Sequence, residues 1–323
     1  MLSVERSNEP TQRQVLYKTK GTFRSQEEKR KHFLEEQKRK RNVNFDAGRN
    51  FEEIPEQRHE DAHLSGNLSK KKFGKMLMQS EWMEEVPGDL MENWYLVPCP
   101  VGKRCIVISE TKICRGFSLS GKFLFQTSAL LKEGKVSRTI LDCIYSKETS
   151  TIFILDVILW AGYSMVNCET EFRFYWLKSK FEENPELLER PNAYKFHPLP
   201  HALATNTETA LESLDFTEKL DGVLFYHKEA HYSAGVTPLV VWLLPFMIPE
   251  VLGISVNEEL AQQPESYPGH LEYIAEYKKK RKEKRRRGRK SVEMDTSGSG
   301  HDESSIFEES GEPVQEEDEL ELG

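Results

Sequence analysis

The pattern of apolar and polar positions predicts a strand-rich region in the middle of the chain. Short runs rich in β-branched and aromatic residues recur there, with turn residues between them, which is typical of strands. The expected strands are WYLVPC (94–99), RCIVIS (104–109), RTILDCIY (138–145), TIFILDVILW (151–160), FRFYWLK (172–178), DGVLFYHK (221–228) and PLVVWLLP (238–245). Two stretches inside this region, 73–86 and 206–216, are expected to be helices.

Two further helices are expected outside the strand-rich region, and both are highly charged. The first follows Ser25, which can cap it, with Glu28 in the capping-box position. Its apolar residues up to Arg41 are Phe33 and Leu34, too few for a core-facing stripe. We therefore expect this helix to be solvent-bridging or to become ordered on a partner. The second charged helix is expected over 269–287.

Charge divides the chain more sharply than its total suggests. The 323 residues have a net charge of −8, yet 29–41 and 278–290 are basic and 302–323 is acidic. Such blocks are typical of interaction arms and tails. The predicted organisation is as follows: 1–10 disordered N-terminus, 11–49 basic arm, 50–72 linker, 73–258 globular domain, 259–323 charged helix and disordered acidic tail. We expect no membrane span and no secretory signal.

Cysteine and histidine positions predict neither a metal site nor a disulfide framework. The five cysteines form no CxxC pair, which favours reduced thiols in a cytosolic or nuclear protein. His227 and His231 are four residues apart, but HKEAH lacks the glutamate after the first histidine that a zinc protease helix carries. We therefore expect no metal and no cofactor.

Four short motifs follow one another in an order that resembles the nucleotidyltransferase core of mRNA capping enzymes and DNA ligases. The first, K-x-D-G-x-R in those enzymes, is C-P-V-G-K-R here. Cys99 stands at the position of the lysine nucleophile and Val101 at that of the aspartate, whereas Gly102 and Arg104 match. The resemblance implies a catalytic loop that has lost its reactive amine but can still meet phosphates through Lys103 and Arg104.

The other three motifs agree with this interpretation. In the L-D-G-E motif only Asp142 of the functional residues is kept. The D-G-hydrophobic-hydrophobic-F motif is intact from Asp221 to Phe225, and Trp242 of the last motif remains without its two lysines. Without a nucleophile, metal carboxylates or phosphate lysines, transfer of a nucleotidyl group has no evident support. We therefore predict a binding protein and not an enzyme.

Longer words of the sequence resemble the snurportin family of nuclear import adaptors over most of 11–277. They include QSEWMEEVPGDL, PCPVGKR, TILDCIY, FRFYWLKSK, DGVLFYHKEAHYSAGVTPLVVW and VLGISV. The resemblance implies an α+β domain of two packed antiparallel sheets with a few helices, like the capping-enzyme core but without its OB domain. It also implies binding of the 2,2,7-trimethylguanosine cap of spliceosomal small nuclear ribonucleoproteins.

The cap-binding residues implied by this resemblance are few. Trp242 corresponds to the tryptophan on which the cationic base stacks, and Trp82 to the one beside the dimethylated amine. Ser80 matches a base-contacting serine, and Cys99 lines the pocket. The chain departs from the family at Gln79, where relatives carry leucine, and at Leu119, where they carry a phosphate-binding lysine that Lys122 is close enough to replace. Without the resemblance, each tryptophan is more simply explained as core.

The basic arm resembles an importin-β-binding segment, whose charge complements an acidic receptor. The residues expected to bind are Arg13, Lys18, Arg24, Lys29, Arg30, Lys31, Lys38, Arg39, Lys40 and Arg41. An RNA-binding arm or a solvated helix is the alternative. The run 278–290 stays open between a localisation signal, an RNA-contacting tail and a partner of the acidic tail.

The favoured interpretation is therefore an adaptor that shuttles between cytoplasm and nucleus. It carries capped RNA on importin-β and returns with the leucine-signal export receptor, although only Met1, Leu2 and Val4 are apolar before the arm. Two alternatives remain. An active nucleotidyltransferase predicts covalent labelling by GTP or ATP. A general RNA-binding protein predicts binding that ignores cap methylation and depends strongly on salt.

Overall fold

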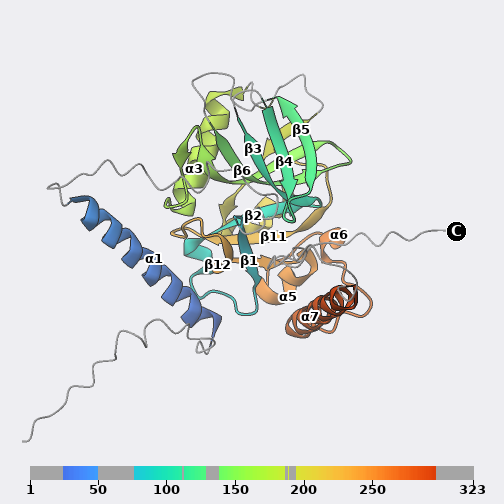
Figure 1. Cartoon of the computed structure of the whole chain (residues 1–323). Coiled ribbons are helices and arrows are strands. Elements are labelled where there is room, and N and C mark those ends of the chain that lie inside the picture. The colour runs from blue at the N-terminus through green and yellow to red at the C-terminus, as the bar shows by residue number, and fades with distance from the viewer. Residues whose placement is uncertain are drawn as a thin grey trace, which may run out of the picture.

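A computed structural model describes residues 25–49, 76–110, 113–128, 138–185, 188 and 194–295. Within them the fold is α+β: two mostly antiparallel sheets pack against each other, with a few helices around them (Figure 1). The predicted fold class is thus confirmed. The loose N-terminus, the linker 50–72 and the acidic tail were predicted for segments that lie outside the described residues.

The first sheet carries the two family tryptophans and has the strand order β1-β12-β11-β2-β10. Its strands are β1 Met78–Trp82, β2 Trp94–Pro100, β10 Ala202–Leu203, β11 Leu220–His227 and β12 Gly235–Leu243. β1 pairs with β12 in parallel, and the other neighbours are antiparallel. β1 is therefore an edge strand of this sheet, with a neighbouring strand on one side only.

The second sheet has the order β5-β4-β3-β6-β7-β8, with β9 parallel to β7. Its strands are β3 Lys103–Ser109, β4 Ile113–Ser118, β5 Phe123–Ser128, β6 Thr139–Ser146, β7 Thr151–Trp160, β8 Tyr163–Ser164 and β9 Lys195–Pro198. The turn at 101–102 carries the chain from β2 of the first sheet to β3 of the second. The CPVGKR motif is therefore the connection between the two layers.

Helices lie at the edges and outer faces of the sheets (Figure 1). They are α1 Gln26–Arg49, α2 Leu90–Asn93, α3 Thr170–Glu183, α4 Thr207–Glu212, α5 Ile248–Leu252, α6 Glu258–Ala261 and α7 His270–Asp295, with short 3₁₀ turns at Ala204–Asn206 and Pro245–Met247. Both charged helices predicted from the sequence are present. Ser25 caps α1 as expected, since its Oγ accepts the Glu28 amide at 3.1 Å.

Successive side chains of the second sheet point to opposite faces, and both faces are buried. Ile106 and Ile108 of β3 pack toward the first sheet, whereas Cys105 and Val107 face a smaller core that includes residues of α3. The central strands are therefore apolar at almost every position, as the sequence runs showed. The larger core extends beyond the predicted boundary at 258, because Ile274 of α7 is buried in it.

Two segments have the opposite structure to the one predicted. The stretch 73–86, expected to be a helix, contains β1, because Met78, Ser80 and Trp82 alternate inward and pair with β12. The run FRFYWLK, expected to be a strand, belongs to α3, where Phe174, Leu177 and Phe181 share a buried face at helical spacing. In both cases tertiary packing overrides a local signal in a short run.

A buried ion pair fastens α3 to the second sheet. Arg173 donates two hydrogen bonds to Asp156 of β7, both at 2.9 Å, and both side chains are fully buried. The same guanidinium donates to the carbonyl oxygens of Cys168 and Ala230. Since every donor direction is used, the guanidinium orients both the helix and the 228–232 loop.

We predict that Arg173→Met lowers the free energy of unfolding by about 3–5 kcal/mol, because it leaves the Asp156 carboxylate buried without its partner. Urea denaturation measures the loss. Lys178→Met on the same helix is the matched control, because Lys178 pairs with Glu182 in solvent, and it should stay within about 0.5 kcal/mol of the wild type. Equal losses in both variants would contradict the structural role of the buried pair.

Candidate functional site

The two family tryptophans lie on adjacent strands at the same level of the first sheet. Trp82 ends β1 and is in register with Trp242 of β12. The register slips between Ser80 and Glu81, where β12 has three extra residues. This irregularity keeps Ser80 and Trp82 on the core side of an edge strand while Glu81 faces outward. The structure thus brings together three of the residues that the sequence predicted for the cap.

The Trp242 indole lies over the backbone of Gly222 on β11. A Cβ built at 222 would be 2.2 Å from the ring atom Cζ2, so only glycine leaves room for it. Cys99 of β2 is in register with Gly222 and is 1% exposed. Asp221 and Gly222 both lie within β11. The motif glycine provides space for the tryptophan.

Two polar atoms of this site are buried without a hydrogen-bond partner: Ser80 Oγ and Trp242 Nε1. Buried polar groups are nearly always paired, and each one left alone costs free energy. Both atoms can donate a hydrogen bond, and they belong to neighbouring strands. A ligand that offers acceptor atoms between β1 and β12 would satisfy them. The indoles of Trp82 and Trp242 are each 4% exposed, so the site is closed in this conformation.

Arg104, predicted to meet phosphates, is committed to a buried network. Its guanidinium donates to both oxygens of Asp142 at 2.6 and 2.8 Å and to the Met78 carbonyl oxygen at 3.3 Å. The Tyr232 hydroxyl donates to Asp142 at 2.6 Å and accepts the Met78 amide at 3.1 Å. The structure therefore gives Arg104 a structural role. It leaves a phosphate role for this residue as an untested prediction.

Burial dominates the titration of this network. It raises the pKa of Asp142, against the opposing effects of the Arg104 guanidinium and the Tyr232 hydroxyl, which favour the carboxylate. Burial likewise raises the pKa of the Cys105 and Cys143 thiols, which lie on β3 and β6 beside it. These thiols are thus poor nucleophiles.

Lys103 and Lys122 are two exposed cations near the interlayer turn. Lys103 begins β3, and the pairing of Cys105 with Ser118 brings the β4–β5 turn, with Leu119 and Lys122, beside that start. Gly102 is required there because a Cβ would be 2.6 Å from a methyl group of Ile144. The register thus places Lys122 at the same end of the sheet as Lys103.

Helix α7 covers the outer side of Trp82. The rings of Tyr277 and Tyr273 meet this indole edge-on, with centroids 5.3 and 6.3 Å away. His270 bonds to the Met83 carbonyl oxygen, and Lys278 pairs with Glu84. Sequence reasoning did not find these tyrosines, because nothing in a charged helix marks which face will meet a distant strand.

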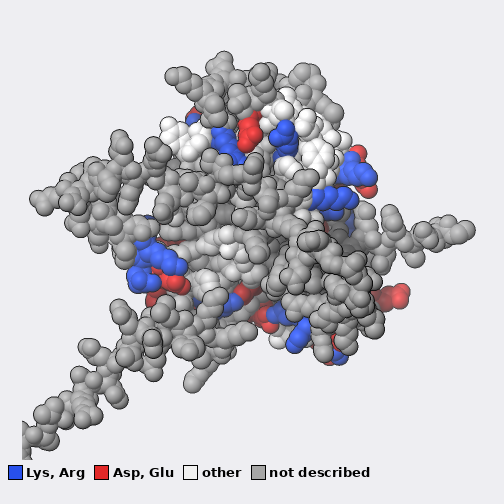
Figure 2. Space-filling model, in the orientation of Figure 1, with Lys and Arg blue, Asp and Glu red and all other residues white. Residues whose placement is uncertain are grey.

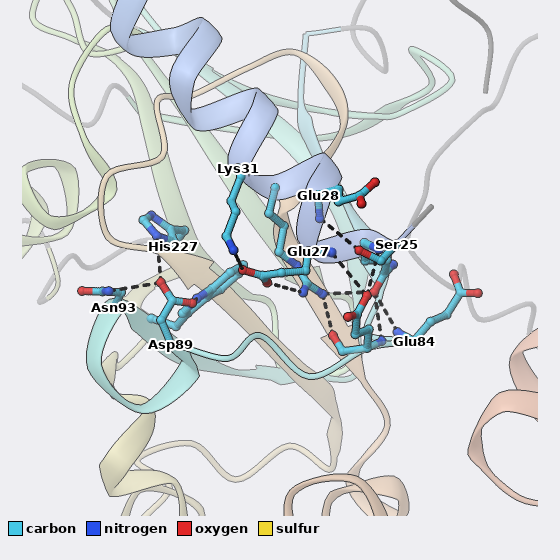
Figure 3. Close-up of polar contacts among 12 residues, drawn as sticks. Ser25, Glu27, Glu28, Lys31, Glu84, Asp89, Asn93 and His227 are labelled. Atoms are coloured by element: carbon cyan, nitrogen blue, oxygen red, sulfur yellow. Dashed lines mark hydrogen bonds and ion pairs between the residues drawn. The ribbon is translucent and has the colours of Figure 1, made fainter. Parts of the chain in front are cut away.

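The basic helix α1 packs along the same sheet, whereas we expected a helix that is solvent-bridging or becomes ordered on a partner. Its first turn is capped from the domain: Glu85 accepts the amides of Gln26 and Glu27, and the Gln26 side chain bonds to the Trp82 carbonyl oxygen. Figure 3 shows Ser25, Glu28 and Glu84 at this end of the helix. Arg30 is buried, donates to the Glu85 carbonyl oxygen and lies over the Trp94 ring. The partner that orders α1 here is thus the domain itself.

Ion pairs continue this contact along the helix. Lys29 pairs with Glu81, Lys38 with Glu229 and Arg41 with Glu169. Figure 2 shows basic and acidic side chains together over α1. Lys38, Lys40 and Arg41 remain half exposed or more, so the helix keeps a cationic outer face. Arg13, Lys18 and Arg24 of the predicted arm lie outside the described residues.

A separate cavity of about 460 Å³ lies beneath α3, and none of the predicted cap residues lines it. Its wall includes Val97, Phe174, Leu177 and His201, and burial lowers the pKa of His201 to about 4. Within the described residues, no group of His, Cys, Asp and Glu side chains is arranged to hold a metal ion. No described helix is long and apolar enough to cross a bilayer.

The fold and the site describe a domain of two packed sheets, with a site lined by tryptophans of β1 and β12 in the first sheet. A family model described as "Snurportin1, m3G cap-binding domain" matches residues 76–245. This match spans more than half of the chain, and the chain belongs to this family. It includes Ser80, Trp82, Cys99, Gly222 and Trp242.

Two DNA ligases are among the solved structures that this chain weakly resembles. The ligase domain of LigD from M. tuberculosis is 13% identical with a TM-score of 0.37, over 51% of this chain and 58% of that one. The Chlorella virus DNA ligase-adenylate is 13% identical with a TM-score of 0.38, over 52% of this chain and 68% of that one. The chain thus spans little more than half the length of the LigD domain.

We predict that Gly222→Ala displaces the Trp242 indole, because the added Cβ overlaps the ring. The expected cost is about 1–3 kcal/mol of unfolding free energy, with a shifted tryptophan emission spectrum. Gly88→Ala is the control, because nothing lies within 4 Å of a Cβ there. An unchanged spectrum in the Gly222 variant would contradict the close packing described above.

Proposed function

We propose that this protein is a non-enzymatic nuclear import adaptor. Its two-sheet domain binds the 2,2,7-trimethylguanosine cap of small nuclear ribonucleoproteins, and its basic arm binds importin-β. The adaptor shuttles between cytoplasm and nucleus and returns with the leucine-signal export receptor. The observation that carries the cap proposal is the pair of unpartnered buried donors, Ser80 Oγ and Trp242 Nε1, inside the segment that matches a cap-binding domain.

The chemistry of the cap fits the residues of this site. Methylation at N7 makes the base cationic, and a cation over an indole face is stabilised electrostatically. Dimethylation removes both hydrogens from the exocyclic amine, so an apolar wall such as Trp82 leaves no ligand donor unpaired. The side chains that now cover Trp242 must move for a base to stack on it, and Lys103 and Lys122 then supply charge for the cap phosphates.

The absence of a catalytic role is supported by the position of the retained motif residues. Cys99 occupies the nucleophile position, buried, with its thiol 3.5 Å from the Val97 carbonyl oxygen. Asp142 and Arg104 are bonded to each other and to Tyr232 and Met78 rather than open to a substrate. A nucleotide held here meets no amine nucleophile from this motif.

We expect the trimethylguanosine cap dinucleotide to quench tryptophan fluorescence at lower concentration than the monomethyl cap. Trp242→Ala should weaken binding by about 1–3 kcal/mol, because it removes the stacking surface. Trp176→Ala on α3 is the matched control and should leave affinity unchanged. Equal response to both caps would contradict cap recognition, and covalent labelling by GTP or ATP would indicate a nucleotidyltransferase instead.

The Ser80→Ala variant in the same titration separates binding from stability. A purely structural serine with an unpaired hydroxyl predicts a neutral or slightly more stable protein. A ligand-contacting serine predicts, in addition, a roughly five- to tenfold loss of cap affinity. Unchanged affinity would remove Ser80 from the site.

The docked position of α1 gives the importin-β proposal a quantitative consequence. A receptor that takes the arm must first separate it from Glu169 and Glu229, so its apparent affinity is reduced by the undocked fraction. Exposed ion pairs are worth about 0.2–1 kcal/mol each. Removing these pairs weakens the docking of α1 on the domain. The free energy lost from docking then appears as higher affinity for the receptor.

We predict that Glu169→Gln with Glu229→Gln raises the affinity for importin-β by about two- to thirtyfold, since the arm itself is unchanged. Titration with purified importin-β measures it. Glu208→Gln with Glu212→Gln on α4 removes the same charge away from α1 and should have no effect. Lower or equal affinity in the first variant would show that the receptor does not compete with the domain for α1.

A further inference from the structure

The strongest feature outside the cap site is the basic half of α7 and its place beside Trp82. Tyr277 touches that indole, and the run 278–290 begins at the next residue in the same helix. This run has eleven Lys or Arg residues and one Glu. It extends for about 20 Å along the helix axis. A ligand held against Trp82 therefore lies next to the start of this basic run.

Contacts near the beginning of α7 hold this helix against the domain. Ile274 is buried in the larger core, the two tyrosines pack on Trp82, and Lys278 pairs with Glu84. The side chains of Lys279, Lys280 and Lys282 are exposed. The helix thus has a packed beginning and a continuation that is basic in sequence, and the packed part holds the helix beside α5 (Figure 1).

We propose that α7 binds the phosphates of the RNA that follows the cap. This inference rests on the proposed function, because it assumes that the cap lies against Trp82 and Trp242. Every nucleotide after the cap adds a negative phosphate. Lys and Arg side chains that neutralise phosphates release counterions, so each contact adds affinity and salt dependence without reading sequence. α7 then distinguishes capped RNA from a free cap nucleotide.

An acidic transport receptor is the competing partner for such a run. RNA is favoured by position: the helix is fastened to the tryptophan of the nucleotide site. The other basic helix, α1, packs instead against the glutamates Glu81, Glu169 and Glu229. α1 thus forms three ion pairs with the domain, whereas among the described residues α7 forms one, between Lys278 and Glu84.

The test compares three ligands with the full-length protein: the trimethylguanosine cap dinucleotide, a 15-nucleotide single-stranded RNA with the same cap, and that RNA with a 5′-hydroxyl. The variant is Lys279→Glu with Lys282→Glu, two exposed positions that should not disturb folding. Lys147→Glu with Lys178→Glu, exposed in the β6–β7 turn and on α3, makes the same charge change elsewhere. Affinity is measured over a series of salt concentrations.

We expect the wild type to bind the capped RNA more tightly than the dinucleotide and with a steeper salt dependence. The α7 variant should lose about tenfold affinity for capped RNA. Its log–log salt slope should fall by about 1.4, since each single-strand phosphate contact contributes about 0.7. Its affinity for the dinucleotide should not change, and the control variant should match the wild type for all three ligands.

Equal affinities and salt slopes for dinucleotide and capped RNA in the wild type would overturn the proposal. So would an α7 variant that keeps its RNA affinity and loses affinity for importin-β, because the run would then serve the receptor. Failure of the dinucleotide to bind would count against the cap site alone. In that case, salt-dependent binding of the uncapped RNA that the α7 variant weakens would still support α7 as an RNA-binding helix.

Discussion

The buried carboxylate of Asp142 holds the two layers of this domain together. Asp142 lies on β6 of the second sheet, and Arg104 and Tyr232 both donate to it. Each of these two side chains also bonds to the backbone of Met78, where β1 of the first sheet begins. Three polar groups that would be costly to bury alone are thus paired across the layers. Their geometry determines where β1, and with it Ser80 and Trp82, lies against β12.

This network changes the meaning of the retained motif residues. Arg104 and Asp142 match two motifs of nucleotidyltransferases, yet here they bond to each other within a closed core. Gly102 and Gly222 also match, and each is required because a Cβ would overlap a neighbouring side chain. A residue that matches a motif can therefore be required for packing alone. The site also holds two buried polar atoms without partners, Ser80 Oγ and Trp242 Nε1.

The segment after β1 connects three parts of the protein. Trp82 belongs to the proposed cap site, and its carbonyl oxygen also bonds to Gln26 of α1. Glu85 caps α1, while Met83 and Glu84 bond to α7. Two helices of similar charge thus meet the domain within a few residues of the same tryptophan. A rearrangement that uncovers Trp82 for a ligand would act on the contacts of both helices.

The sequence by itself determined the local features whose signal is contained in a few neighbouring residues. These are the central strands, the CPVGKR turn, the capped start of α1, the helix at 269–287 and the family tryptophans, because apolar runs, capping groups and motif spacing act over short distances. The tertiary structure decided what depends on distant partners. β1 is a strand because β12 pairs with it, and α3 is a helix because its buried face packs against the second sheet. α1 packs on the domain because its basic residues form ion pairs with glutamates far away in sequence. A local sequence pattern does not indicate which distant group a side chain will contact. The tyrosines over Trp82 and the pairing of Arg104 with Asp142 could therefore be seen only in the folded chain.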